Sequence, residues 1–258
     1  MAYVFFLGGQ DLEMLTIRKL LEENNQEFFD RQLKWGAKAS DYPVLMNPAS
    51  FGNGDSGKMP VLVELDIDGG PLPYGAIVVD HHNNRSGELA SILQVFKLLG
   101  IEPTREHLLI AANDSGYIPA MLHAGATSEE IADIRRLDRE AQGVTVEMEI
   151  EAEDAIYCRT EDKGVVIVQL PHNKVSAVTD RMFTSWPDGR ENLVVVCKMG
   201  NFDYEVYYFG RGDICRETKE MFNGFGGGTG FGDPAKNAFA GCKTKTPVDV
   251  INFVVGRQ

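Results

Sequence analysis

The feature that most constrains the fold of this chain is the alternation of short apolar strands with amphipathic helices through its first half. Strand-like apolar segments are predicted at residues 3–7, 59–65 and 77–79. Helical patterns lie between and after them, at residues 12–21, 88–99, 106–112 and 127–139. Alternating strands and helices favour a mostly parallel sheet with helices on both faces. The first half is therefore predicted to be an α/β domain.

The second half has a different pattern, in which apolar and polar residues alternate one by one. This period is typical of half-exposed antiparallel strands. Such strands are predicted at residues 144–150 and within residues 157–170, 193–198 and 204–209, with one helix near 216–222. We therefore predict two domains, at residues 1–145 and 155–258, the second being a smaller α+β domain.

The composition excludes several classes of protein. A formal net charge of −13 argues against a broad surface for long nucleic acids, which requires clustered Lys and Arg. Apolar runs fall short of the roughly 20 residues that a membrane helix needs, and the first apolar segment meets Gly8-Gly9 too soon for a signal peptide. The widely spaced cysteines are expected to be reduced thiols. We expect a cytoplasmic protein that binds neither a membrane nor long nucleic acid.

The triplet Asp80-His81-His82 directly follows a β-branched run that is predicted to be a buried strand, and it precedes a helix. In open α/β sheets, ligands bind at the carboxyl ends of the strands. Three polar side chains in a row are costly to bury there without a partner. A turn with a hydrogen-bonded aspartate and two half-exposed histidines is the simpler interpretation of the triplet alone.

Acidic residues recur where the other strands of the first half end. Asp11 and Glu13 follow the first strand, Glu64 and Asp66 end the second, and Asp114 lies further on in an Asn-Asp-Ser-Gly segment. Each has an ordinary alternative, as a helix N-cap, a solvated strand end or the start of a turn. Together with an imidazole they would form a site for a hard divalent cation. A mixed oxygen and imidazole set favours manganese, magnesium or iron over zinc.

On these residues the chain resembles the DHH-family phosphoesterases, which are named for the Asp-His-His triplet. Residues 110–116 resemble the segment that carries the family's fourth motif acid. Residues 225–230, Phe-Gly-Gly-Gly-Thr-Gly, with 238–241 resemble the substrate-binding glycine motif of the DHH-associated domain. Residues 208–212 are similar to that domain's arginine-bearing strand. The resemblance covers nearly the whole chain, in the family's order.

The resemblance implies a set of roles in the first domain. The metal ligands would be Glu13, His81 and Asp114, with Glu64 completing or bridging the site and Asp11 holding a second metal or its water. The metal would be manganese or magnesium.

Two further roles in the triplet follow from the resemblance. Asp80 would accept a hydrogen bond from the His81 ring, and His82 would donate to a phosphoryl oxygen. The catalytic group would thus comprise His82, Asp80 and Asp11.

The resemblance also implies substrate-binding residues in the second domain. Arg211 would clamp a phosphate, a task that suits a guanidinium better than an ammonium. The glycine run would bring backbone N–H groups close to the ligand, and its residues are Gly226, Gly227, Gly228 and Thr229.

The sequence departs from the family pattern in both domains. The metal-binding histidine of the first motif falls on Leu7, which cannot coordinate a metal. The second-motif aspartate has no clear equivalent; Glu64 is the first candidate and Asp66 the next. Thr229 stands where the glycine motif has its histidine. One metal position is therefore predicted to be nearly complete, and the other to lack its imidazole.

Two functions follow from this pattern. The first is a metal-dependent phosphoesterase that hydrolyses a small phosphorylated substrate in the cleft between the domains: a nucleotide, a short oligonucleotide or a phosphoanhydride. The second is a relative that binds such a ligand without hydrolysing it. Leu7 favours the second, because two metals activate the bridging water in the family and one metal activates it less. Related proteins often dimerise, so a homodimer is compatible with either function.

Overall fold

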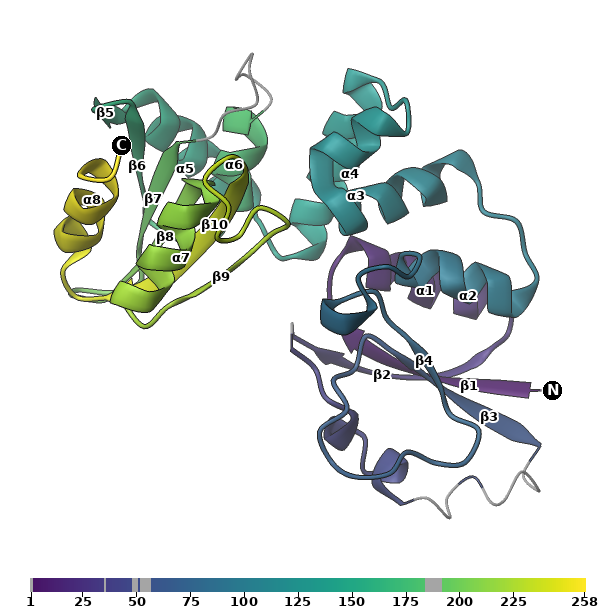
Figure 1. Ribbon diagram of the computed structural model, residues 1–258. Coiled ribbons are helices and arrows are strands. Elements are labelled where there is room, and N and C mark those ends of the chain that lie inside the picture. The colour runs from purple at the N-terminus through teal and green to yellow at the C-terminus, as the bar shows by residue number, and fades with distance from the viewer. Residues whose placement is uncertain (1, 35, 48–50, 52–56, 184–191) are drawn as a thin grey trace. The chain divides into compact units, whose positions relative to one another are not determined.

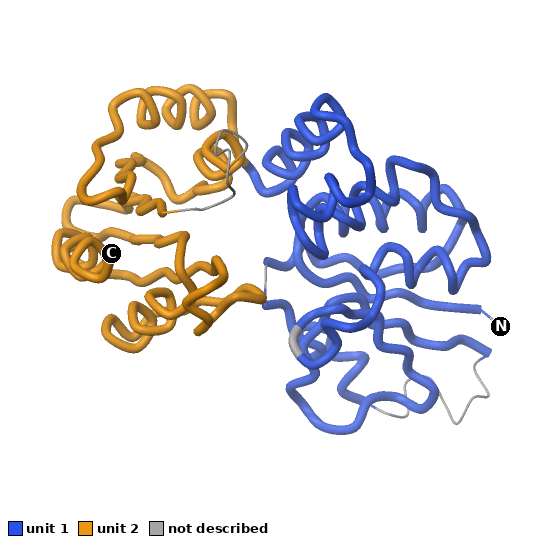
Figure 2. Tube along the Cα trace, turned by 45° about the horizontal axis from the view of Figure 1, so that its top comes forward, with its two compact units in different colours: residues 1–143 blue, residues 144–258 orange. Residues whose placement is uncertain are grey.

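The computed structural model describes residues 2–34, 36–47, 51, 57–183 and 192–258. The chain divides into two compact units, Met1–Gly143 and Val144–Gln258 (Figure 2). Each unit has its own sheet and its own apolar core.

Unit 1 is built on a four-stranded sheet in the order β2-β1-β3-β4, in which all neighbours are parallel (Figure 1). The strands are β1 (Ala2–Gly9), β2 (Glu27–Leu33), β3 (Lys58–Val63) and β4 (Ile77–Val79). The central strands β1 and β3 are apolar and buried on both faces, as parallel strands usually are. The predicted α/β class with a mostly parallel sheet is confirmed.

The two faces of this sheet are covered in different ways. One face packs against α1 (Leu12–Glu23) and α2 (Ser91–Leu99), and α3 (Arg105–His123) and α4 (Ser128–Ala141) pack on these two helices in the same apolar core. The other face is covered by two short 3-10 helices, η1 (Ala39–Asp41) and η2 (Pro43–Met46). Tyr42, between the two helices, and Leu45 of η2 pack against the strands. Another short helix, η4 (Asn83–Arg85), follows the Asp-His-His triplet. Helices thus lie on both faces, but those of the second face are single turns.

Helix α3 is longer than the sequence indicates. It was predicted to end at residue 112, before a turn, yet it continues to His123 across a kink. Gly116 and Tyr117 have non-helical backbone angles, and Tyr117 lies at φ +59° and ψ −150°. Pro119 follows, and proline clashes with the carbonyl group four residues earlier. Asp114 therefore lies on a helix, close to its kink, and not in a turn.

Unit 2 has a six-stranded sheet in the order β5-β6-β7-β8-β10-β9, in which only β6 and β7 are parallel neighbours within the described residues. Its strands are β5 (Thr160–Asp162), β6 (Val165–Leu170), β7 (Leu193–Lys198), β8 (Tyr204–Arg211), β9 (Phe225–Gly227) and β10 (Asn237–Thr244). Helices α5 (Val146–Tyr157) and α6 (Ser176–Phe183) cover one face, and α7 (Gly212–Met221) and α8 (Pro247–Val255) cover the other.

The predicted strand at residues 144–150 is wrong, because this segment begins α5. Thr145 is the N-cap, and its side chain accepts a hydrogen bond from the backbone N–H of Met148. Met148, Ala152, Ala155 and Ile156 pack against the core at helical spacing, whereas the exposed Val146 and Ile150 give the segment its alternation. A strong cap therefore decides the structure of a segment whose alternation is typical of a strand.

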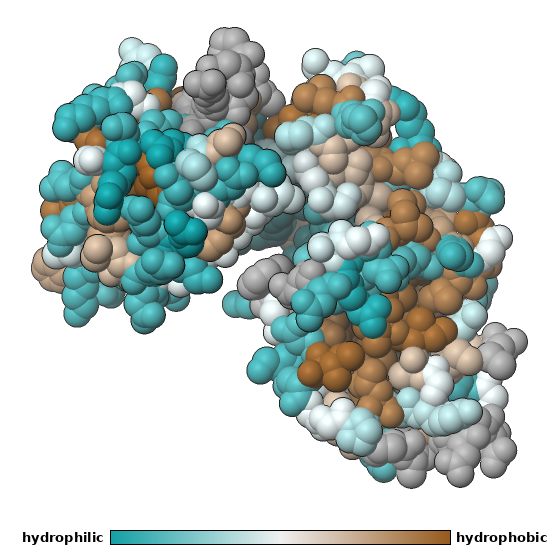
Figure 3. All heavy atoms as spheres, in the orientation of Figure 1, coloured by the Kyte–Doolittle hydropathy of each residue, from teal (hydrophilic) through white to brown (hydrophobic). Residues whose placement is uncertain are grey.

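The surface of unit 1 carries one apolar area that is plain in Figure 3, where apolar residues gather around the edge strand β4. Ile77 and Val78 of this strand are half-buried. The four cysteines all lie in the described residues and form no disulfide. Among the described helices, none has the length and apolar character needed to cross a membrane.

Candidate metal centre

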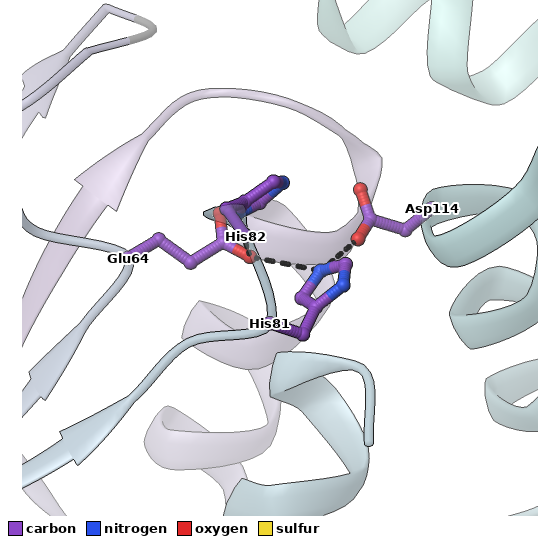
Figure 4. Close-up of side chains that lie close together, drawn as sticks. All are labelled: Glu64, His81, His82 and Asp114. Carbon is purple, nitrogen blue, oxygen red and sulfur yellow. Dashed lines mark ion pairs between the residues drawn. The ribbon is translucent and has the colours of Figure 1, made fainter. Parts of the chain in front are cut away.

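The acidic and histidine residues of unit 1 meet at the carboxyl ends of three parallel strands. Leu7 pairs with Val63, and Val63 pairs with Val79, so β3 and β4 end at the same level, while β1 continues from Leu7 to Gly9. Glu64 follows β3 directly, and the Asp-His-His triplet follows β4. Helix α3 brings Asp114 to the same place. Figure 4 shows the four side chains that lie close together here, which are Glu64, His81, His82 and Asp114.

His81 lies at the centre of this group. Its Nε2 atom lies 2.5 Å from Oδ2 of Asp114, 3.5 Å from Oε1 of Glu64 and 3.8 Å from Oε2 of Glu13. One potential ligand atom from each of Glu64, His81, His82 and Asp114 lies within 4.8 Å of the others. A single cation could therefore contact several of these atoms after small side-chain movements.

The atoms that converge here lack other partners. Oε2 of Glu13, Oε1 of Glu64, Nε2 of His81 and Oδ2 of Asp114 are all buried and form no hydrogen bond. His81 and Asp114 approach each other at ion-pair distance, but without the alignment of a hydrogen bond. Buried polar atoms are rarely left in this state, because each costs free energy. A divalent cation between them would satisfy all four, and the donor set fits manganese or magnesium.

The charges of the group perturb its titration. Burial and then repulsion from Asp114 and Glu64 raise the pKa of Glu13 well above its usual range. Burial alone would lower the pKa of His81, but its contacts with Asp114 and Glu64 outweigh burial and raise the pKa to about 10. Burial likewise opposes ionisation of Glu64, yet contacts with His81 and Glu13 lower its pKa overall. Without a cation, the group therefore holds protons at neutral pH that a cation would displace.

Glu13 is fixed from outside the group. It lies in the first turn of α1 and is 2% exposed. Its Oε1 atom accepts a hydrogen bond of 2.9 Å from the backbone N–H of Ile92, at the start of α2. One carboxylate oxygen is thus held by the N-terminus of a helix, which favours a negative charge. The other oxygen is left to face His81.

Glu64 is held in an uncommon backbone conformation. Its φ of +52° lies in the left-handed region, which non-glycine residues seldom adopt. Its N–H donates to the carbonyl of Val79 at 2.9 Å. A Cβ atom on Gly8 would lie 2.3 Å from the carbonyl oxygen of Glu64, so only glycine lets β1 end this close to it. The alternative candidate Asp66 is exposed and makes backbone hydrogen bonds with Ala37 and Ala39.

Asp11 lies next to the group but has a second task. It is the N-cap of α1, and its Oδ1 accepts a hydrogen bond of 2.8 Å from the N–H of Met14. Burial and then the charge of Glu64 raise its pKa to about 7. Leu7, at the position of the family's first-motif histidine, is fully buried in the helix-covered core. The side chains around Asp11 thus offer no imidazole from β1.

The Asp80 side chain does not make the contact that was predicted for it. Its Oδ1 accepts a hydrogen bond of 2.9 Å from the N–H of His82 and lies 3.0 Å from Nδ1 of the His82 ring. Aspartate often bonds to the backbone two residues ahead, which turns its carboxylate away from the next side chain. Asp80 therefore orients His82 and not His81. His82 is 42% exposed and remains accessible beside the buried group.

The predicted substrate-binding residues of unit 2 lie side by side. Arg211 ends β8, and a Cβ atom on the next residue, Gly212, would lie 1.7 Å from the carbonyl oxygen of Gly230. The glycine run, with Gly226 and Gly227 in β9 and Gly228 and Thr229 after it, thus leads to the start of α7. Arg211 already pairs with Asp213, at 2.6 Å from Nη2 to Oδ2.

A buried charged group behind the metal centre was missed by the sequence reasoning. It consists of Asn113, Arg135 and Asp138, which are 7%, 6% and 5% exposed. Arg135 and Asp138 are spaced like an ion pair on a helix surface and lie on the same side of α4 as Ile131 and Ile134. Charges on the apolar side of an amphipathic helix were the signal that could have identified them.

Comparison with known proteins adds little to this geometry. No protein-family model and no curated protein match the sequence. Similar solved structures include RecJ from Thermus thermophilus in complex with Mn²⁺, at 10% identity and a TM-score of 0.47, covering 99% of this chain and 52% of RecJ. The chain thus spans about half the length of that protein. An uncharacterized protein from Helicobacter pylori G27 is 13% identical over the full length of both chains, with a TM-score of 0.28. At such values the likenesses decide nothing about function.

Proposed function

We propose that this protein is a metal-dependent phosphoesterase that binds one divalent cation, manganese or magnesium, at Glu13, Glu64, His81 and Asp114. The observation that carries the proposal is the convergence of four buried polar atoms without hydrogen-bond partners at the carboxyl ends of parallel strands. The resemblance of the Asp-His-His triplet to the DHH family supports phosphate chemistry at this place.

The side chains around the cation have distinct tasks in this proposal. A bound divalent cation would polarise a phosphoryl oxygen and lower the pKa of a bound water. His82, oriented by Asp80 through its Nδ1 atom, presents Nε2 to a phosphoryl oxygen and stabilises the charge that develops there. Asp11 holds the attacking water with the carboxylate oxygen that does not cap α1.

The substrate is a small phosphorylated molecule: a nucleotide, a short oligonucleotide or a phosphoanhydride. A net charge of −13 repels the long polyanion of a nucleic acid. Arg211 and the glycine run of unit 2 supply a guanidinium and accessible backbone for a phosphate. Because Asp213 already neutralises Arg211, a phosphate must compete with that carboxylate or share the guanidinium with it.

A second candidate function is binding of the same kind of ligand without hydrolysis. The full burial of Leu7 favours it, because this position supplies no imidazole for a second metal. One cation lowers the pKa of a bound water less than two cations that share the water, so it supplies less hydroxide for the attack. The two candidates agree on the cation site and differ only in turnover.

Manganese titration by calorimetry on metal-stripped protein tests the proposal, beside hydrolysis assays on a dinucleotide, a cyclic dinucleotide and pyrophosphate. The variant His81→Ala should lose manganese binding, whereas His123→Ala, which changes an exposed histidine at the end of α3, should keep it. Manganese-dependent hydrolysis that His81→Ala loses would support the enzyme. Binding without any turnover would support the second candidate, and a wild-type protein that binds no manganese would overturn both.

A further inference from the structure

The buried group of Arg135, Asp138 and Asn113 connects α4 to both helices that carry candidate metal ligands. Arg and Asp are almost never fully buried unless they are paired. We propose that Arg135 is a positioning residue for the metal centre, which holds Asp114 of α3 and Glu13 of α1 at the spacing that one cation requires. This inference rests on the proposed cation site.

The first connection leads to Asp114. Nη1 of Arg135 donates to Oδ1 of Asn113 at 2.7 Å, and Asn113 directly precedes Asp114. The guanidinium also lies over the ring of Tyr117, 4.4 Å from its centroid. Tyr117 has a left-handed φ of +59°, a strained conformation that surrounding contacts must hold. Arg135 thus contacts the chain on both sides of Asp114, next to the kink at Gly116 and Tyr117.

The second connection leads to Glu13. Nη1 of Arg135 also donates to Oδ2 of Asp138 at 2.7 Å, and Gln142 donates to the same oxygen at 3.0 Å. The other oxygen of Asp138 accepts a hydrogen bond of 3.4 Å from the backbone N–H of Leu12. Leu12 begins α1 and lies between Asp11 and Glu13. A carboxylate at the first turn of a helix is favourable, so Asp138 joins Asp11, the N-cap, in holding the first turn of α1.

Stability alone is a poor explanation for this group. Desolvation of a buried ion pair offsets most of its attraction, and apolar residues of similar volume often replace such pairs without loss. Partners that orient metal ligands have a larger effect on the site, since their removal typically weakens metal binding about 10- to 100-fold. Arg135 bonds to Asn113, the residue before Asp114. Its partner Asp138 bonds to Leu12, the residue before Glu13. Each connection therefore ends one residue from a candidate metal ligand.

Three variants test the role of Arg135. Asn113→Leu cuts the connection to Asp114 and keeps the ion pair of Arg135 with Asp138. The double variant Arg135→Met/Asp138→Leu removes both charges of this ion pair together. Arg105→Met is the matched control: Arg105 pairs with Glu130 at 2.6 and 2.9 Å and so also joins α3 to α4, at the end distant in sequence from Asp114. Manganese affinity is measured by calorimetry and the stability of each metal-free variant by thermal unfolding.

We expect Asn113→Leu and the double variant to bind manganese about 10- to 100-fold more weakly than the wild type, with metal-free melting temperatures close to its own. Arg105→Met should keep the wild-type affinity. Wild-type manganese affinity in the double variant would overturn the inference and leave the cation site intact. A manganese affinity that falls across the variants only in proportion to the melting temperature would do the same. A wild-type protein that binds no manganese would instead remove the proposed function on which the inference rests.

Discussion

Replacement of Asp11 by asparagine should stabilise the metal-free protein at about pH 8 and not at about pH 4. Burial and the charge of Glu64 raise the pKa of Asp11 from 3.8 to about 7 in the folded protein. Between these values the folded protein keeps a proton that the unfolded chain releases, so the free energy of unfolding falls as the pH rises. Above about pH 7 the full effect is reached. The free energy of unfolding is then lower by about 4 kcal/mol, at 1.36 kcal/mol for each pKa unit.

The asparagine of this variant would not titrate, and asparagine caps a helix as well as aspartate does. The hydrogen bond from the Met14 N–H to the side chain of residue 11 is therefore retained. The stabilisation should be measured by urea unfolding of metal-stripped protein at about pH 4 and about pH 8. Asp133→Asn, which changes a 63%-exposed carboxylate on α4, is the control and should change little at either pH. Equal effects of Asp11→Asn at the two pH values would refute this account of Asp11.

Three further predictions follow from the same geometry. Manganese should displace the proton of His81, so the affinity for manganese should rise about tenfold per pH unit from about pH 7 to about pH 9. The proton release can be measured by calorimetry in buffers that differ in their heat of ionisation. Gly8→Ala should cost about 1–3 kcal/mol in urea unfolding and weaken manganese binding, whereas Gly87→Ala, with open space around it, should not. Tyr42→Phe should cost about 1–3 kcal/mol, because the buried hydroxyl donates to the carbonyl of Leu7 at 2.6 Å; an unchanged urea midpoint would contradict this.

The sequence predicts the location of the candidate metal centre because strand geometry sets part of it. Parallel strands of one sheet end at one edge, so residues directly after apolar segments meet there. Glu64 and His81 follow this rule, and Glu13 comes from the helix that β1 leads into. Asp114 was predicted at the same site from its motif, although the structure shows it on a longer helix than expected.

The contacts behind the site were beyond sequence reasoning because they join distant parts of the chain. Asp138 bonds to Leu12 across 126 positions, and no local pattern relates the two residues. The pairing of Asp80 with His82, and not with His81, depends on backbone angles at the end of β4 that residue types do not determine. Segment 144–150 was misjudged because two local signals disagree, and the cap at Thr145 outweighs the alternation.

The burial of Leu7 limits how this protein could change over evolutionary time. The side chain lies fully inside the core, together with Phe5, Val63 and Val79. A histidine at this position would place a polar ring among apolar neighbours that have no hydrogen bond to offer it. A second cation could therefore not be gained through this one substitution, since the core neighbours would have to change at the same time. Under the proposed function, selection acting on single substitutions would therefore keep the site at one cation.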